Sequence, residues 1–197
     1  MNRLNYLSIM FLSLLMFIET SMAQISKIKP LTISLFTVGT QLPGGKNLPI
    51  HPGIELGTEF KYSKSEKTKW FQTVKVGVYH HRYSQTGIQL YSEIGYRPTI
   101  WNRFSGDVKL GVGYLHAIPD LQQFKLENGV YTKSKSLGRS QFMASVSLGI
   151  GYNLTDSPES KRIFIVTQTF FQTPFIKSYV PVLPNSALHI GISIPFF

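Results

Sequence analysis

Acidic and basic residues recur at alternate positions of four apolar stretches, a spacing that would bring them together inside a closed sheet. The set is Glu55, Glu59, Lys75, Glu93, Arg97, Asp107 and Lys109. With a turn centred near Glu66, Lys75 lies diagonal to Glu55 and Glu59, and a tight hairpin around Ser84 places Lys75 opposite Glu93. Buried charges persist when they are paired, so we expect a salt-bridged interior. A proton- or ion-conducting path, or a carboxylate pair for acid–base chemistry, is the alternative.

The five histidines fall near the predicted ends of strands. They are His51, His80, His81, His116 and His189. Alternation points His51, His81 and His189 inward, and the register above makes His51 and His81 direct neighbours. Imidazoles clustered in this way could bind zinc or copper, or titrate near neutral pH. Because no spacing motif accompanies them, the competing interpretation is a polar zone at the strand ends in which the three do not converge.

A serine, two histidines and a glutamate lie close together in sequence and suggest a hydrolytic triad: His80, His81, Ser84 and Glu93. A triad requires its side chains to meet on one face. Alternation places Glu93 on the polar face, His80 on the apolar face and Ser84 at a hairpin tip. We therefore expect no catalytic residue, and nothing in the chain indicates a cofactor.

Alternating apolar residues predict that all of these side chains stand on β-strands. The last stretch is the plainest example, with Leu188, Ile190, Ile192, Ile194 and Phe196 separated by small or polar residues. Such a strand must bury or shield one face, and it suits the closing strand of a barrel. The same pattern predicts an all-β, eight-stranded antiparallel up-and-down barrel, with strands over residues 31–38, 53–63, 70–81, 87–97, 103–117, 141–154, 162–172 and 186–197.

The first 23 residues have the composition of a cleaved signal peptide. Arg3 precedes an uncharged apolar run over 6–18, and Ser21-Met22-Ala23 gives the small-x-small cleavage pattern. We expect one mature domain over 24–197, without disulfides because the chain has no cysteine. The formal charge of +10 would suit nucleic acid, but an exported chain rarely meets any, so anionic lipid headgroups or lipopolysaccharide phosphates are the expected partners.

Loop lengths and aromatic residues are typical of a barrel that crosses a membrane. Short and long connections largely alternate, and the longest is the polar segment 119–139. Aromatic side chains collect at one predicted end and would form an interfacial girdle: Tyr62, Trp70, Tyr96, Trp101, Tyr152 and Phe196. Ordinary strand propensity would enrich aromatic residues without sorting them to one end.

Together, the leader, the eight alternating strands, the aromatic girdle and the terminal aromatic resemble the small outer-membrane β-barrel superfamily. The loop style looks, more loosely, like the barrel-domain proteins of Bacteroidetes. The resemblance implies the envelope of a Gram-negative bacterium and insertion by the barrel-insertion machinery, with Phe197 as the insertion signal. The alternating set ends instead on Phe196, with Pro195 nearby. Superfamily members include anchors, adhesins, narrow pores and lipid A-modifying enzymes, and the His-x-Ser-Asn motif of the lipid A deacylases is absent from this chain.

Our first expectation is a monomeric, non-enzymatic outer-membrane barrel with a charge-filled narrow lumen and basic surface loops. Two alternatives stay open. One is a hydrolase that modifies lipids of the outer leaflet. The other is a soluble, secreted barrel that holds an apolar ligand.

Overall fold

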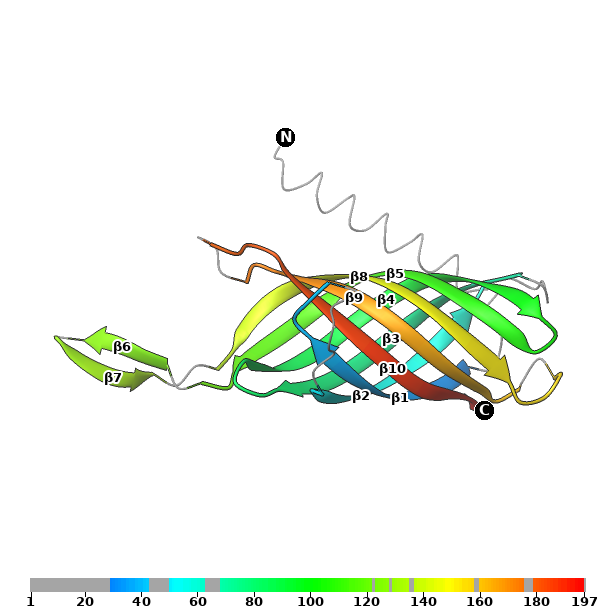
Figure 1. The fold of residues 1–197 in the computed structure, drawn as a ribbon, viewed down its shortest axis with the longest axis horizontal. Helices are drawn as coiled ribbons and strands as arrows, with labels where there is room; N and C mark the ends of the chain where they lie inside the picture. Colours follow the sequence, from blue (N-terminus) through cyan, green and yellow to red (C-terminus); the bar gives the residue numbers. More distant parts are fainter. Residues whose placement is uncertain are drawn as a thin grey trace, which may run out of the picture.

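Eight antiparallel strands form a closed barrel (Figure 1). The computed structural model describes residues 29–42, 50–62, 68–121, 123–127, 129–134, 137–157, 160–175 and 179–196. The barrel strands are β1 (Lys29–Gly39), β2 (Pro52–Lys61), β3 (Thr68–His81), β4 (Gln85–Trp101), β5 (Phe104–Pro119), β8 (Arg139–Asn153), β9 (Arg162–Thr173) and β10 (Leu183–Phe196). Among the residues described, no helix is both long and apolar enough to cross a membrane.

The last strand closes the barrel, as predicted. β10 pairs with β1 along the whole length of β1, from Lys29 opposite Phe196 to Gly39 opposite Ser186. Its other side pairs with β9. Closure gives both sides of every strand a hydrogen-bonding neighbour, so the sheet has no free edge.

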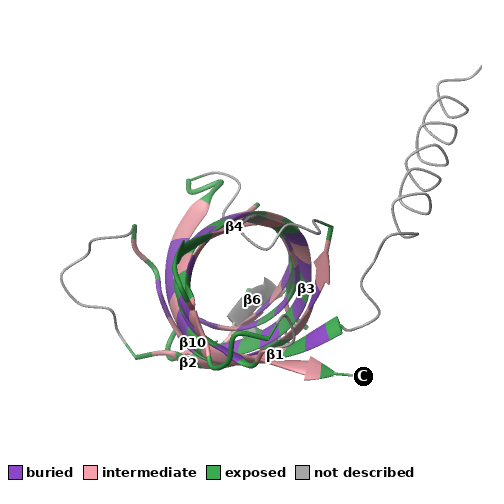
Figure 2. Cartoon of the chain, turned by 90° about the vertical axis from the view of Figure 1, so that its right-hand side faces the viewer, coloured by how far each residue is buried: buried purple, intermediate pink, exposed green. Residues whose placement is uncertain are grey.

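The two faces of the wall have opposite chemistry. Apolar side chains cover the outside: Leu110 on β5, Leu148 on β8 and Ile190 on β10 are 58%, 59% and 55% exposed. The residues that alternate with them point inward and are buried, and many are polar or charged. Figure 2 looks along the barrel and shows buried and exposed positions alternating around its wall. This is the reverse of a soluble protein, whose apolar residues lie inside.

The hairpin between β3 and β4 differs from the prediction by two positions of register. Lys75 lies opposite Tyr91, and Glu93 lies opposite Thr73. The turn is centred on Tyr83, which adopts a left-handed φ of 63° and donates its N–H to the Asp120 carboxylate at 2.9 Å. Because a shift by two residues keeps every side chain on its face, the predicted inward and outward sets survive.

The segment 119–139 was expected to be a plain polar loop, and this expectation was wrong. It contains a two-stranded hairpin of β6 (Gln123–Glu127) and β7 (Val130–Ser134). Figure 1 shows this hairpin projecting beyond the end of the barrel opposite to that of the C-terminus. The sequence signal was Asn128-Gly129, the dipeptide most typical of a tight hairpin turn, and Gly129 has a φ of 81°.

The lumen is filled in two layers. Towards the β6–β7 end it holds an apolar cluster, made of Phe36, Val38, Tyr79, Tyr91, Leu115, Met143, Phe170 and Ala187. The other layer contains the charged residues and extends to the opposite end. The apolar layer was not predicted, because the sequence pattern was interpreted as a polar inner face throughout.

Replacing Gly113 with alanine tests how closely β4 and β5 pack. A Cβ at Gly113 would lie 2.5 Å from the Leu90 carbonyl oxygen, whereas at Gly106 of the same strand the nearest atom is Ile100 Cδ1 at 3.4 Å. We expect Gly113→Ala to lower the free energy of unfolding by about 1–3 kcal/mol, and Gly106→Ala to change it by less than about 0.5 kcal/mol. Urea unfolding in detergent micelles, followed by tryptophan fluorescence, measures both. Equal stabilities of the two variants would contradict the packing.

Candidate functional site

The first group of buried charges lies where β2, β3, β4 and β5 face the lumen. Lys75 Nζ is 3.1 Å from Glu55 Oε1 and 3.1 Å from Glu93 Oε2. Lys109 Nζ is 3.5 Å from the same Glu93 oxygen. Lys75 therefore contacts two of the carboxylates predicted for it, Glu55 and Glu93, even though the hairpin register differs from the prediction.

Neutral side chains also donate hydrogen bonds to the carboxylates of Glu55 and Glu93. Glu55 accepts hydrogen bonds from Ser34 Oγ at 3.2 Å and from the Tyr91 hydroxyl. Glu93 accepts from Ser147 Oγ at 2.6 Å and, more weakly, from a Gln168 amide at 3.3 Å. Hydrogen bonds of this kind are what allow an ionised carboxylate to remain away from water.

The second group lies nearer the end at which β10 finishes. Arg97 donates from Nη1 and Nη2 to the two oxygens of Glu59, both at 2.8 Å, and from Nε to Asp107 Oδ1 at 2.6 Å. Arg162 Nη1 reaches Asp107 Oδ2 at 3.0 Å. The Arg97 guanidinium also lies 4.2 Å from the centre of the Phe71 ring. Glu59 is thus bound by Arg97, although it lies diagonal to Lys75 as predicted, since Lys75 pairs with Gly57.

The two groups balance in charge. Within the part of the chain that the structure describes, the ion-paired interior holds four cations (Lys75, Arg97, Lys109 and Arg162) against four anions (Glu55, Glu59, Glu93 and Asp107). Sequence reasoning missed Arg162. It opens β9, whose inward Phe164 and Val166 are apolar like the outward residues beside them, so the alternation that would have placed Arg162 inside is weak.

Of the three histidines considered as a possible metal site, two lie together and the third lies apart. The rings of His51 and His81, which were predicted to be neighbours, stack with centroids 3.7 Å apart. His189 instead stacks on Phe36 at 4.6 Å, deep in the lumen, with Nδ1 3.7 Å from Glu55 Oε1. The register explains why the three do not converge: His189 lies opposite Phe36, three residues inward from the pair Gly39 and Ser186.

No group of three or more histidine, aspartate or glutamate side chains is arranged to hold a metal ion among the residues that the structure describes. His80 is exposed and His116 is half-buried, and both make local contacts, His80 with Thr86 at 3.0 Å and His116 with the Leu137 carbonyl at 2.8 Å. His51 lies at the barrel mouth, just before β2 begins. Its pKa is lowered from the ordinary value of 6.5, first by partial burial and then by the nearby imidazoles of His81 and His80.

The structure does not assemble the serine, histidine and glutamate set. Glu93 is buried in the lumen against Lys75 and Ser147. Ser84 lies in the β3–β4 turn, where its N–H donates to the His81 carbonyl at 3.0 Å. The separation is the one that strand alternation predicted.

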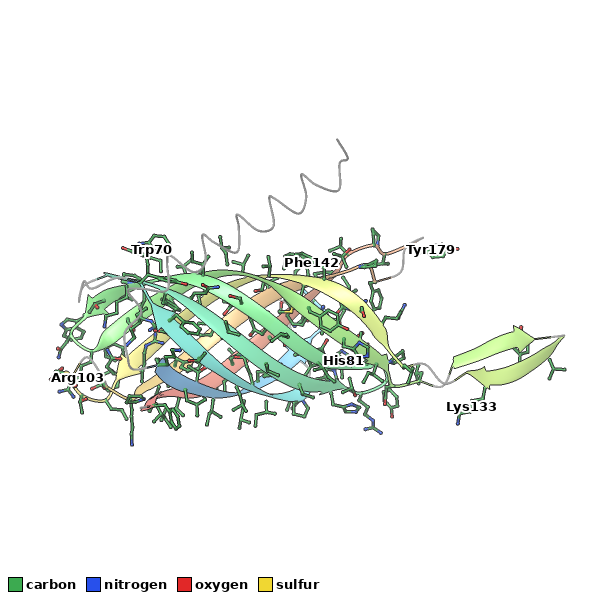
Figure 3. The ribbon with its side chains drawn as sticks, turned by 180° about the vertical axis from the view of Figure 1, so that it is seen from behind. Trp70, His81, Arg103, Lys133, Phe142 and Tyr179 are labelled. Atoms are coloured by element: carbon green, nitrogen blue, oxygen red, sulfur yellow. The ribbon has the colours of Figure 1, made fainter. Side chains whose placement is uncertain are left out.

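The six girdle residues lie on the end of the barrel that carries the β2–β3, β4–β5 and β8–β9 turns. Tyr62 pairs with Trp70 through a backbone hydrogen bond of 2.9 Å, and Trp70 contacts Tyr96 with ring centroids 5.1 Å apart. Tyr152 contacts Phe104, which sequence reasoning omitted, at 4.9 Å. Trp101 and Phe196 are exposed. Figure 3 shows Trp70 and Arg103 near one end, and His81 and Lys133 towards the other.

Phe197 and residues 1–23 lie outside the described residues.

Comparisons with known proteins agree with the barrel. No family model matches the chain, and no curated protein matches its sequence. The crystal structure of Neisserial surface protein A superposes with a TM-score of 0.56 at 12% identity, covering 87% of this chain and 99% of that one. The outer membrane enzyme PagL gives 0.49 at 8% identity, with coverages of 85% and 99%. The attachment invasion locus protein Ail of Yersinia pestis gives 0.45 at 12% identity, with coverages of 86% and 98%. At these identities the likeness to Neisserial surface protein A establishes the fold.

Removing one arginine tests the buried charge network. Arg97→Met leaves Glu59 and Asp107 without their shared cation inside the wall, and we expect a loss of about 3–5 kcal/mol in the free energy of unfolding. Arg103→Met is the matched control. Arg103 also makes a two-pronged pair, with Asp156 at 2.7 and 2.5 Å, but in an exposed turn, so its loss should leave stability almost unchanged. Urea unfolding compares them, and equal losses would count against the network.

Proposed function

We propose that this protein is a monomeric β-barrel of a bacterial outer membrane that acts as a structural or surface-interaction component, without catalysis and with a lumen closed to ions. The observation that carries the proposal is the apolar outer wall around a charge-balanced interior. An exposed apolar surface of this extent is typical of contact with hydrocarbon.

The dimensions of the wall support a membrane location. Its strands run from 10 to 17 residues, and a tilted spanning strand needs about 9–11. The aromatic girdle at one end corresponds to the interfacial belt of membrane barrels. A soluble barrel that held an apolar ligand would need polar residues outside and an apolar cavity inside, which is the opposite arrangement.

The filling of the lumen supports a role other than transport. An ion that entered would have to displace the pairs around Glu93 and Arg97 in one layer and pass Leu115, Met143 and Phe170 in the other. Eight strands leave little room beyond the side chains themselves. In the part of the chain that the structure describes, Ser84 and Glu93 of the possible hydrolytic set lie apart, which gives no support to an outer-leaflet lipid hydrolase.

The proposed partners follow from charge at the β6–β7 end. Since the interior is balanced, the formal charge of +10 resides elsewhere in the chain. The segments that connect the barrel strands at this end carry Asp120 and Glu127 against Lys46, Arg82, Lys125, Lys133, Lys135 and Lys177, and Arg139 begins β8 beside them. Because both termini of such barrels face the periplasm, this end would be extracellular, where phosphates of lipopolysaccharide match a basic surface.

The remaining parts of the proposal concern export and origin. Residues 1–23 would be a signal peptide removed after Ala23, and Phe197 would present the terminal aromatic to the barrel-insertion machinery. A narrower kinship with the Bacteroidetes barrel-domain proteins rests on loop style.

One reconstituted sample tests the proposal against its three competitors. The protein is refolded into lipopolysaccharide-containing liposomes, checked by heat-modifiable gel mobility, and assayed by flotation, planar-bilayer conductance and lipid A mass spectrometry. We expect co-flotation with the lipid, no steady open levels and an unchanged lipid A mass. Protein left in the soluble fraction, large stable conductance steps or a shifted lipid A mass would each overturn a different part of the proposal.

A further inference from the structure

The histidine pair at the barrel mouth has features that the structural role of the wall does not require. His51 immediately precedes β2 and His81 ends β3, and both side chains are half-buried. The β2–β3 register continues to this level, which makes them cross-strand neighbours with stacked rings 3.7 Å apart and 29° from parallel. Figure 3 places His81 towards the end from which the β6–β7 hairpin projects.

Hydrogen bonds select the state of the His81 ring. Its Nδ1 lies 3.3 Å from the Arg82 carbonyl oxygen, which can only accept, so Nδ1 carries the proton. In the neutral ring Nε2 then holds a lone pair. Metal-ligating histidines are held in this way, by an N–H donated to a backbone carbonyl from the nitrogen that does not bind the ion.

The hydroxyl oxygen of Thr40 lies next to that lone pair but does not donate its proton to it. Thr40 Oγ1 is 3.5 Å from His81 Nε2, but it donates its single proton to Asn185 Oδ1 at 3.2 Å. The lone pair of His81 Nε2, which lies in the plane of the ring, is therefore next to a hydroxyl oxygen that can also act as an acceptor, and the His51 ring is stacked on the face of the same imidazole. In the described part of the chain, the histidine paired with a carboxylate is His189, so neither mouth imidazole is committed to a salt bridge.

We propose that His51 and His81 form a two-imidazole site for a divalent transition-metal ion of borderline softness, with Thr40 Oγ1 and water available as oxygen ligands. Two neutral imidazoles with oxygen donors suit Cu²⁺ and Zn²⁺, and Cu²⁺ binds such ligands the more tightly. For both imidazoles to bind one ion, the His51 ring must turn its edge towards His81 Nε2. Rotation about the broad χ2 torsion of His51 provides this at small cost, while His81 keeps its N–H to the Arg82 carbonyl.

The charges around the histidine pair indicate whether a cation would be held by coordination to nitrogen or by electrostatic attraction. Among the described residues of this turn, the charged or chargeable groups are His80, on the outer face, Arg82, whose guanidinium lies 4.7 Å from the Tyr83 ring centre, and Asp120, whose carboxylate accepts the Tyr83 N–H. Arg82 is positive and repels a cation. Binding at this mouth would therefore depend on the nitrogen lone pairs and would not extend to Mg²⁺ or Ca²⁺, which prefer oxygen ligands.

The test uses the full chain, purified without a histidine tag and folded in detergent micelles. Cu²⁺ is titrated by calorimetry, and the bound ion is examined by electron paramagnetic resonance. We expect one site with two nitrogen ligands, and a loss of affinity of about tenfold or more in His51→Gln and in His81→Gln. His116→Gln, altered on the exposed wall, is the matched control and should bind as the unmodified chain does.

Several results would overturn the site: unchanged binding in both mouth variants, an equal loss in His116→Gln, or a spectrum with one nitrogen or none. If a mouth variant fails to show heat-modifiable mobility, the unmodified chain decides the question. Zn²⁺ should then shift the imidazole NMR signals of His51 and His81 while leaving those of His80, His116 and His189 in place. Shifts spread over all five histidines would also contradict the proposal.

Discussion

Charge neutrality inside the wall is the condition on which the rest of this structure depends. Once every second residue of each strand is directed to an apolar exterior, the residues between them must share a narrow interior without water. Glu93 shows how this is achieved, since it is buried completely yet contacts Lys75, Lys109 and the Ser147 hydroxyl. Equal numbers of opposite charges make the buried ions mutually dependent, because removing one leaves its partners uncompensated.

The apolar layer and the glycines of the inner face follow from the same lack of space. Long side chains such as Arg162 and Tyr79 lie over the neighbouring strand only because Gly151 and Gly87 stand where a side chain would block them. The layers divide the interior between an ion-paired region and a region where an apolar cluster lies beside buried amides such as Gln85 and Gln172. A barrel filled in this way presents its outer wall and its two ends to other molecules.

Much of this could be predicted from the sequence, because a period of two residues states which side chains share a face. It predicted barrel closure, the strand order and the placement of His51 next to His81. What failed depends on turn chemistry and on long-range register. The β3–β4 turn is centred on Tyr83, which has a left-handed backbone, and this register places Lys75 opposite Tyr91. The position of His189 along the lumen depends on the pairing of β10 with β1. The inward aromatic residues of β1 and β9 also fall outside a simple polar-inside rule.

Because the chain contains no cysteine, single cysteines along β5 can report directly which solvent each position meets. Spin labels introduced in turn from Asp107 to Val112 in lipid vesicles would be tested with oxygen, which concentrates in hydrocarbon, and with a water-soluble nickel chelate. The structure predicts oxygen accessibility at Val108, Leu110 and Val112 and protection from both reagents at the residues between them. Accessibility to the nickel chelate at the even positions, or no alternation at all, would contradict an apolar wall around a dry, charge-balanced interior.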